Sequence, residues 1–155
     1  MKLRTAVFAA SLAMASCSRD SRGNRREYIP EDIAAIARQA ERMKACPDRY
    51  ILLEGCVSQQ RIADHMKLAK RYSKERRYSF AGATYANIGH IREARAMARK
   101  CKDDRTRLDT RTEENKEISR IATPEGICRE FIDMIADRYV EIRDVARVNP
   151  RAARF

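Results

Sequence analysis

Five cysteines are the residues of this 155-residue chain whose chemistry is most informative. They are Cys17, Cys46, Cys56, Cys101 and Cys128. In an exported protein, an odd number leaves one cysteine without a disulfide partner. Cys17 differs from the others because it directly follows an apolar N-terminal segment. It is therefore a candidate for covalent modification, and the other four are candidates for two disulfides.

The N-terminus has the pattern of a secretory signal. Lys2 and Arg4 precede ten residues, AVFAASLAMA at 6–15, which are too few to cross a bilayer as a mature helix. Residues 13–15, AMA, form an A-x-A cleavage site, whereas residues 14–17, MASC, resemble the lipobox of bacterial lipoproteins. In that family the cysteine is acylated and becomes the first residue of the mature chain. We expect acylation of Cys17, because it also removes the odd cysteine.

This pattern divides the chain into three regions. Residues 1–16 are the expected signal peptide, 17–28 a lipidated flexible tether, and 29–149 a helical domain. The tether has four arginines and no apolar residue between 18 and 27, so an acyl anchor would hold it near anionic headgroups. We expect a protein of the cell envelope that is lipid-anchored and faces the periplasm. Cleavage at the A-x-A site would instead give a soluble periplasmic or secreted protein, and the compact apolar run disfavours a mitochondrial presequence.

The other four cysteines flank two predicted connections between helices. Cys46 ends the first helix and Cys56 lies before the next, while Cys101 ends the fourth and Cys128 opens the last. Adjacent antiparallel helices bring such ends together, so 46–56 and 101–128 are the simplest pairs, although three connectivities remain formally open. A fully helical segment 47–54 would hold Cys46 and Cys56 about 15 Å apart. No disulfide spans that distance, so a loop or bent turn is then required.

Metal binding is the competing interpretation of these cysteines. The spacings contain no C-x-x-C motif, and the two histidines, His65 and His90, stand singly inside predicted helices. Structural zinc sites typically use closely spaced ligand pairs, so we expect no metal and no cofactor. The sequence also lacks G-x-S-x-G, H-E-x-x-H, phosphate-loop and G-x-G-x-x-G motifs. We therefore expect no catalytic residues and no enzymatic activity.

The elements that must position the cysteines are predicted to be helices. Charged residues make up 35% of the chain and aromatic residues 6%, which is typical of helical domains. Apolar spacing, capping residues and prolines predict helices over 30–45, about 58–73, 78–87, 91–102 and 124–148, with a short helix over 48–54 closed by Gly55. On the last helix the expected buried face consists of Cys128, Phe131, Ile135, Tyr139, Ile142 and Ala146.

Residues 78–101 resemble one unit of the tetratricopeptide repeat family. The match is carried by Tyr78, Gly82, Tyr85, Gly89, Ala94 and Ala98, with Cys101 in place of a small residue. The family repeats a helix-turn-helix of 34 residues, and one helix of each pair lines a groove that takes extended peptides. The resemblance implies an all-α fold, a short array of antiparallel helical hairpins. With the cysteines as staples, such an array would be suited to protein interaction.

Basic residues predict the nature of the partner. The formal charge is +11, and removal of the expected signal peptide leaves 31 bases against 22 acids, or +9. Because the apolar positions of helix 91–102 face the core, its basic positions form an exposed row. This row consists of Arg92, Arg95 and Arg99, and continues to Lys102. We expect another envelope protein, or an acidic peptide segment, to bind across Tyr85 and this row.

The expected function is that of a non-enzymatic, envelope-tethered, helical protein-interaction module. Nucleic acid is disfavoured, because the chain has no Trp, no evident interleaving of aromatic with basic residues and no groove-reading motif. One alternative is a basic helical binder of an anionic surface or polymer, whose binding high salt would abolish. Another is a small lipoprotein of the kind by which conjugative elements exclude a second element, a resemblance in size, tether and cysteines.

Overall fold

Helices make up nearly all of the regular structure in the computed structural model, which describes residues 30–106 and 122–148. In chain order the elements are α2 (Pro30–Ala45), β1 (Tyr50–Ile51), β2 (Gly55–Cys56), α3 (Gln59–Lys74), α4 (Tyr78–Asn87), α5 (Ile91–Ala98), the 3-10 helix η1 (Cys101–Asp103) and α7 (Pro124–Arg147). Ser58 and Thr123 cap α3 and α7, each accepting a backbone N–H with its side-chain oxygen. The helical prediction is confirmed for all five of these α-helices.

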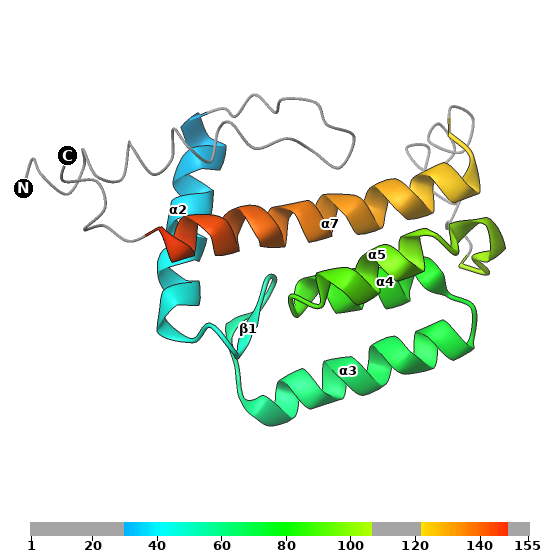
Figure 1. Cartoon of the computed structure of the whole chain (residues 1–155), viewed down its shortest axis with the longest axis horizontal. Helices are drawn as coiled ribbons and strands as arrows, with labels where there is room; N and C mark the ends of the chain where they lie inside the picture. Colours follow the sequence, from blue (N-terminus) through cyan, green and yellow to red (C-terminus); the bar gives the residue numbers. More distant parts are fainter. Residues whose placement is uncertain (1–29, 107–121, 149–155) are drawn as a thin grey trace, which may run out of the picture.

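The longest helix, α7, joins two hydrophobic clusters. Its N-terminal half packs on α4 and α5 through Ile132 and Ala136. Its C-terminal half packs on α2 and the short hairpin through Tyr139 and Ile142. Figure 1 shows α7 lying across the molecule, with α2 at one end and the α3–α4–α5 layer beneath it. The two clusters therefore depend on one helix that runs through both of them.

Helix α4 is buried on nearly all sides, because α3, α5 and α7 all pack against it. Its sequence, YSFAGATYAN, is rich in small residues that allow this close approach. A Cβ atom placed on Gly82 would lie 2.4 Å from Cδ1 of Ile132, so only glycine fits between α4 and α7 without movement. The turn after α4 uses Gly89 at a φ of +77°, and the ring of Tyr139 packs against it. Both glycines of this segment thus set how closely α7 can lie.

The segment after α2 is a β-hairpin, so the prediction of a short helix over 48–54 is wrong. Strands β1 and β2 pair antiparallel, with Tyr50 opposite Cys56 and Ile51 opposite Gly55. Tyr50 and Ile51 are buried, and these aromatic and β-branched side chains favour an extended backbone. Gly55 has a φ of +84°, where it turns the chain within the hairpin rather than closing a helix.

The hairpin supplies the bend that the first disulfide needs. Cys46 and Cys56 form a disulfide with a Cα–Cα distance of 5.8 Å. Cys101 and Cys128 form the second, with a Cα–Cα distance of 5.7 Å, which ties η1 to the first turns of α7. The structure thus selects the simplest of the three connectivities. These four sulfurs are all in disulfides, so none of them is a thiolate available to a metal.

The buried face of α7 is rotated from the one that spacing predicted. Ile132 and Ala136 are fully buried, whereas Phe131, predicted to be buried, is 39% exposed. Cys128, Tyr139 and Ile142 lie in the core as predicted. The reason is the close approach of α4 at Gly82, which draws Ile132 rather than Phe131 toward the neighbouring helix. A second difference concerns helix 91–102, which ends at Ala98 and resumes as η1 at Cys101.

Candidate interaction surface

The three arginines predicted as a basic row are all exposed, Arg92 and Arg95 on α5 and Arg99 at its C-cap position. Arg92 and Arg99 form no ion pair with any residue that the structure describes. Arg95 differs, because its guanidinium lies 3.5 Å from the carboxylate of Asp137 on α7. Arg92 and Arg99 therefore keep their full charge for a partner, while Arg95 also tethers α5 to α7. We call these three residues the α5 row.

Tyr85 does not belong to this surface, which corrects the role expected for it. Its side chain is only 7% exposed and packs in the cluster formed by α3, α4, α5 and α7. Burial, assisted by the carboxylate of Glu93, raises the pKa of its hydroxyl above the usual value. The cause lies in the burial of α4 on nearly all sides, which places Tyr85 among core residues rather than along an open groove.

A second group of cations gathers where α3, the following turn and η1 meet. We call it the cationic end, and it consists of Lys74, Arg76, Arg77, Lys100, Lys102 and Arg105. Two hydrogen bonds join its segments. The Arg105 N–H donates to the carbonyl oxygen of Arg76 at 2.8 Å, and the Tyr78 N–H donates to the side-chain carboxylate of Asp104. Only Arg77 of the six makes an ion pair within the described residues, at 3.7 Å from Glu75.

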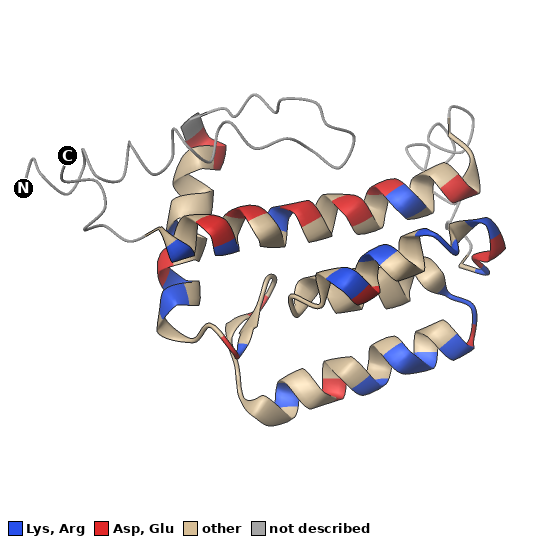
Figure 2. Ribbon diagram, in the orientation of Figure 1, with Lys and Arg blue, Asp and Glu red and all other residues tan. Residues whose placement is uncertain are grey.

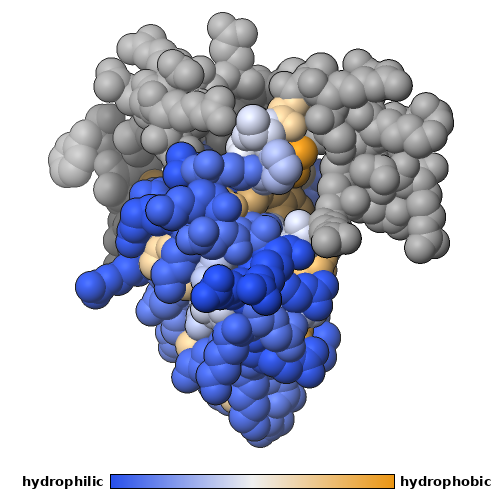
Figure 3. All heavy atoms as spheres, turned by 90° about the vertical axis from the view of Figure 1, so that its right-hand side faces the viewer, coloured by the Kyte–Doolittle hydropathy of each residue, from blue (hydrophilic) through white to orange (hydrophobic). Residues whose placement is uncertain are grey.

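The charges of the molecule are unevenly distributed. Residues 59–106 contain thirteen Lys and Arg against five Asp and Glu, whereas α7 contains four against six. Figure 2 shows red segments repeated along α7 and mainly blue ones on α3 and around η1. Figure 3, which views the molecule from the side of η1, shows a tapering face that is hydrophilic almost throughout. Basic character is therefore concentrated in residues 59–106, most of all on α3.

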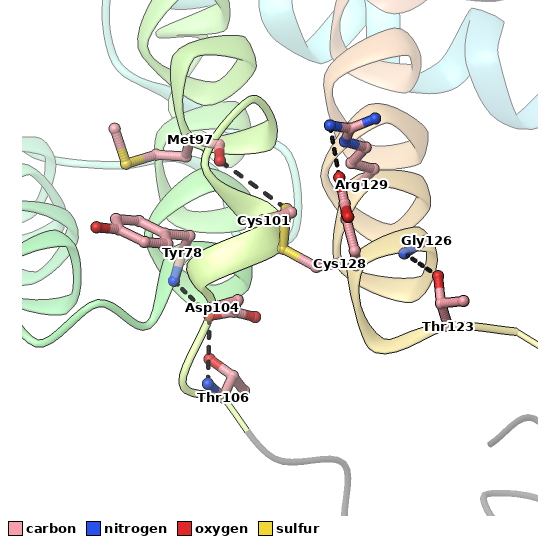
Figure 4. The surroundings of a disulfide bond; sticks show 10 residues. Tyr78, Met97, Cys101, Asp104, Thr106, Thr123, Gly126, Cys128 and Arg129 are labelled. Atoms are coloured by element: carbon pink, nitrogen blue, oxygen red, sulfur yellow. Dashed lines mark hydrogen bonds and ion pairs between the residues drawn. A yellow bond between two sulfur atoms is a disulfide. The ribbon is translucent and has the colours of Figure 1, made fainter.

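Contacts from distant parts of the sequence hold the segments of the cationic end together. Figure 4 shows the disulfide from Cys101 to Cys128 beside the carboxylate of Asp104. That carboxylate accepts the N–H of Tyr78 at 2.7 Å and the N–H of Thr106 at 3.2 Å. Arg77, at the N-cap position of α4, makes no side-chain cap, so Asp104 supplies the missing acceptor from 26 residues away.

Aromatic and cationic side chains are stacked next to this end, a feature that sequence reasoning missed. The guanidinium of Arg77 lies 5.0 Å from the ring centroid of Tyr72 and 4.6 Å from that of Phe80. Lys100 lies 5.7 Å from the ring centroid of Tyr78, and Phe80 is 36% exposed. The signal was present in residues 70–80, KRYSKERRYSF, where aromatic and basic residues do interleave.

A third polar group ties the hairpin to α3. Glu54 accepts two hydrogen bonds from the guanidinium of Arg61, at 2.9 and 2.8 Å, and lies 3.0 Å from Nε2 of His65. The hydrogen bond from Arg61, followed by that from His65, lowers the pKa of Glu54 despite some desolvation. Through these contacts the carboxylate of Glu54 links the hairpin segment to α3. His65 thus lies beside the carboxylate of Glu54, which also binds Arg61.

The remaining expectations concern the N-terminal region, metal binding and membrane-spanning helices. Cys17, the signal peptide and the tether lie outside the described residues. Within 30–106 and 122–148, no group of three or more His, Cys, Asp or Glu is placed to hold a metal ion. Among the helices described, none is both long and apolar enough to span a bilayer.

Comparisons with protein families, curated proteins and solved structures found no match to this chain.

Proposed function

We propose that this chain is a non-enzymatic helical interaction module of the cell envelope, which binds an acidic segment of another protein through the α5 row. The observation that carries the proposal is that Arg92 and Arg99 are exposed and form no ion pair with any described residue. Exposed cations on a rigid helix attract acidic segments and orient them on approach. The disulfides and the buried α4 give that helix a fixed position.

The compartment is supported by chemistry that requires oxidising conditions. Two disulfides persist in secreted and periplasmic proteins and are rare where glutathione keeps thiols reduced. A lipid on Cys17, at the MASC motif, would hold the domain at a membrane through residues 18–29. The amino-terminal peptide of the native protein, measured by mass spectrometry, distinguishes an acylated Cys17 from a free Ser16.

We also interpret α4 and α5 as a tetratricopeptide-like unit. Support comes from two short helices joined by the turn 88–90 and packed against each other, with Ala81, Gly82, Ala86, Ala94 and Ala98 buried. The burial of Tyr85 moves the proposed contact from the first helix of the unit to the second. The partner segment would therefore lie along the outer side of α5.

The test reverses the two arginines that have no described ion-pair partner. Arg92→Glu with Arg99→Glu should reduce affinity for a glutamate-rich peptide at least tenfold, because four units of charge change at the contact. Arg95 stays unchanged, since a glutamate there would face Asp137. The matched control is Arg38→Glu with Arg42→Glu, which makes the same charge change on exposed positions of α2.

The same pair of variants tests the proposal in the native envelope. A photo-crosslinker at position 92 should join an acid-rich segment of a membrane or periplasmic protein, and one at position 38 should not. Equal loss of peptide affinity in the α5 variant and the α2 control would show that only net charge matters. That result would contradict a binding site on α5.

A further inference from the structure

Helices α3 and α4 end in the same backbone motif, but with different residues at its critical position. After α4, Gly89 has a φ of +77°, its N–H donates to Ala86, and the next N–H, of His90, donates to Tyr85 at 2.9 Å. After α3, the corresponding position is Arg76, with a φ of 58°. Its N–H donates to Ser73, and the N–H of Arg77 donates to Tyr72 at 2.9 Å. Both are Schellman motifs, in which glycine is the usual residue.

Arginine is an unfavourable choice at this position. A left-handed backbone brings the Cβ of a non-glycine residue close to the following carbonyl, so glycine holds the same turn with less strain. Arg76 is the only non-glycine residue with positive φ in 30–106 and 122–148. The stability of the helix end therefore does not explain why an arginine stands there.

Contacts within the protein do not explain it either. Arg76 is exposed, and its hydrogen bonds to other described residues involve only its backbone N–H and carbonyl groups. Its guanidinium forms no ion pair or hydrogen bond with any residue that the structure describes. A side chain that strains the backbone and has no internal partner is expected to serve a contact outside the molecule.

The surroundings of Arg76 indicate the chemistry of that contact. The adjoining segments contain the five other cations of the cationic end and only three carboxylates, those of Glu75, Asp103 and Asp104. One of these, Asp104, is engaged in capping α4. Guanidinium groups match the geometry of phosphate oxygens, and the half-exposed ring of Phe80 lies directly beside Arg77. Basic and aromatic side chains together are typical of segments that lie at the headgroup level of membranes.

We propose that the cationic end is a docking surface for a bilayer of anionic phospholipid, with Arg76 at its centre. Figure 3 shows that the side of the molecule on which η1 lies is mostly hydrophilic. The cations come from three segments, the end of α3, the turn after it and the residues around η1, rather than from one row along a helix. That arrangement suits many headgroup phosphates better than a single extended peptide. The surface shares no residue with the α5 row, although Lys100 directly follows Arg99. Its assignment rests on the proposed envelope location but not on acylation of Cys17.

The test uses vesicle binding by the full mature chain with Cys17→Ser, which carries no acyl group. It should bind vesicles containing phosphatidylglycerol, not those of phosphatidylcholine alone, and 0.5 M salt should release it. Arg76→Gly should weaken binding about fivefold, as expected for one basic side chain near a charged membrane surface. The same substitution should raise the melting temperature, because glycine removes the backbone strain.

Two controls separate this surface from the α5 row and from general charge. Arg38→Gly is not suitable because position 38 lies inside a helix, so Arg38→Gln serves as the matched loss of one charge. Arg92→Gln is the corresponding loss of one charge in the α5 row. Both Arg38→Gln and Arg92→Gln should weaken vesicle binding less than Arg76→Gly does. The proposal would be overturned by equal binding to both lipid compositions or by a lower melting temperature for Arg76→Gly. It would also be overturned if Arg76→Gly lost no more vesicle affinity than Arg38→Gln. Displacement from vesicles by a glutamate-rich peptide at micromolar concentration would also overturn it, in favour of a protein partner.

Discussion

A single missing methyl group at Gly82 determines how closely α4 and α7 pack. Alanine is normally better than glycine inside a helix by roughly 0.5–1 kcal/mol. Here the added Cβ would lie 2.4 and 2.6 Å from two side-chain atoms of Ile132, which is fully buried and cannot turn toward solvent. Overpacking in a tight core costs about 1–3 kcal/mol, so the clash outweighs the helix preference.

We therefore predict that Gly82→Ala destabilises the protein by about 1–2 kcal/mol in urea unfolding. The same substitution made in an Ile132→Ala background should be neutral or stabilising, because the space is then empty. This change of sign makes a double-mutant cycle decisive. If Gly82→Ala were destabilising by the same amount in both backgrounds, the contact with Ile132 would not be the cause.

At the scale of the element, α4 depends on an acceptor that its own sequence does not provide. Asp104 accepts the first N–H of the helix at 2.7 Å and also orders the chain after η1. We predict that Asp104→Ala lowers the free energy of unfolding by about 1 kcal/mol, the usual effect of losing a cap. Asp104→Asn, which keeps an acceptor oxygen, should lose less. The neighbouring Asp103→Ala is the control, and an equal loss there would contradict a specific cap.

Helix positions could be predicted from the sequence because their signals are local. The starts of α2, α3 and α7 are marked by Pro30, by Ser58 and by Thr123 with Pro124, and the end of α2 is marked by Pro47. The hairpin at 50–56 could not be predicted in this way, because its strands have two residues each and their pairing depends on burial against α2 and α7. The cap by Asp104 was equally inaccessible, since it joins residues 26 positions apart.

The candidate surfaces likewise combine features that local sequence predicts with features that depend on the fold. The exposure of Arg92 and Arg99 follows from helical periodicity, so the sequence predicts it. The pairing of Arg95 with Asp137 and the burial of Tyr85 depend on which helices surround α4 and α5, and no local pattern contains that information. The cationic end combines both cases. Its aromatic and basic run at 70–80 is visible in the sequence, whereas the approach of η1 to that run is a property of the fold.

At the scale of the whole molecule, the two disulfides lie at opposite ends of the helical framework. Cys46–Cys56 joins the end of α2 to the hairpin, in the cluster that the C-terminal half of α7 covers. Cys101–Cys128 joins η1 to the start of α7, in the cluster with α4 and α5. Each bond thus secures one cluster, and α7 connects the two.

Removing the bonds one at a time should reveal their different contributions. Loop-closure entropy assigns about 2.8 kcal/mol to the shorter loop and about 3.6 kcal/mol to the longer one. We predict that Cys101→Ala with Cys128→Ala is more destabilising than Cys46→Ala with Cys56→Ala, as measured by urea unfolding. Burial adds to the difference, because both Cys101 and Cys128 lie in the core, whereas Cys56 is exposed. For the same reason a mild reductant should open Cys46–Cys56 first, which thiol alkylation and peptide mapping would detect. Earlier reduction of the Cys101–Cys128 bond, together with a smaller loss of stability on its removal, would show that the cluster around α4 does not depend on this bond.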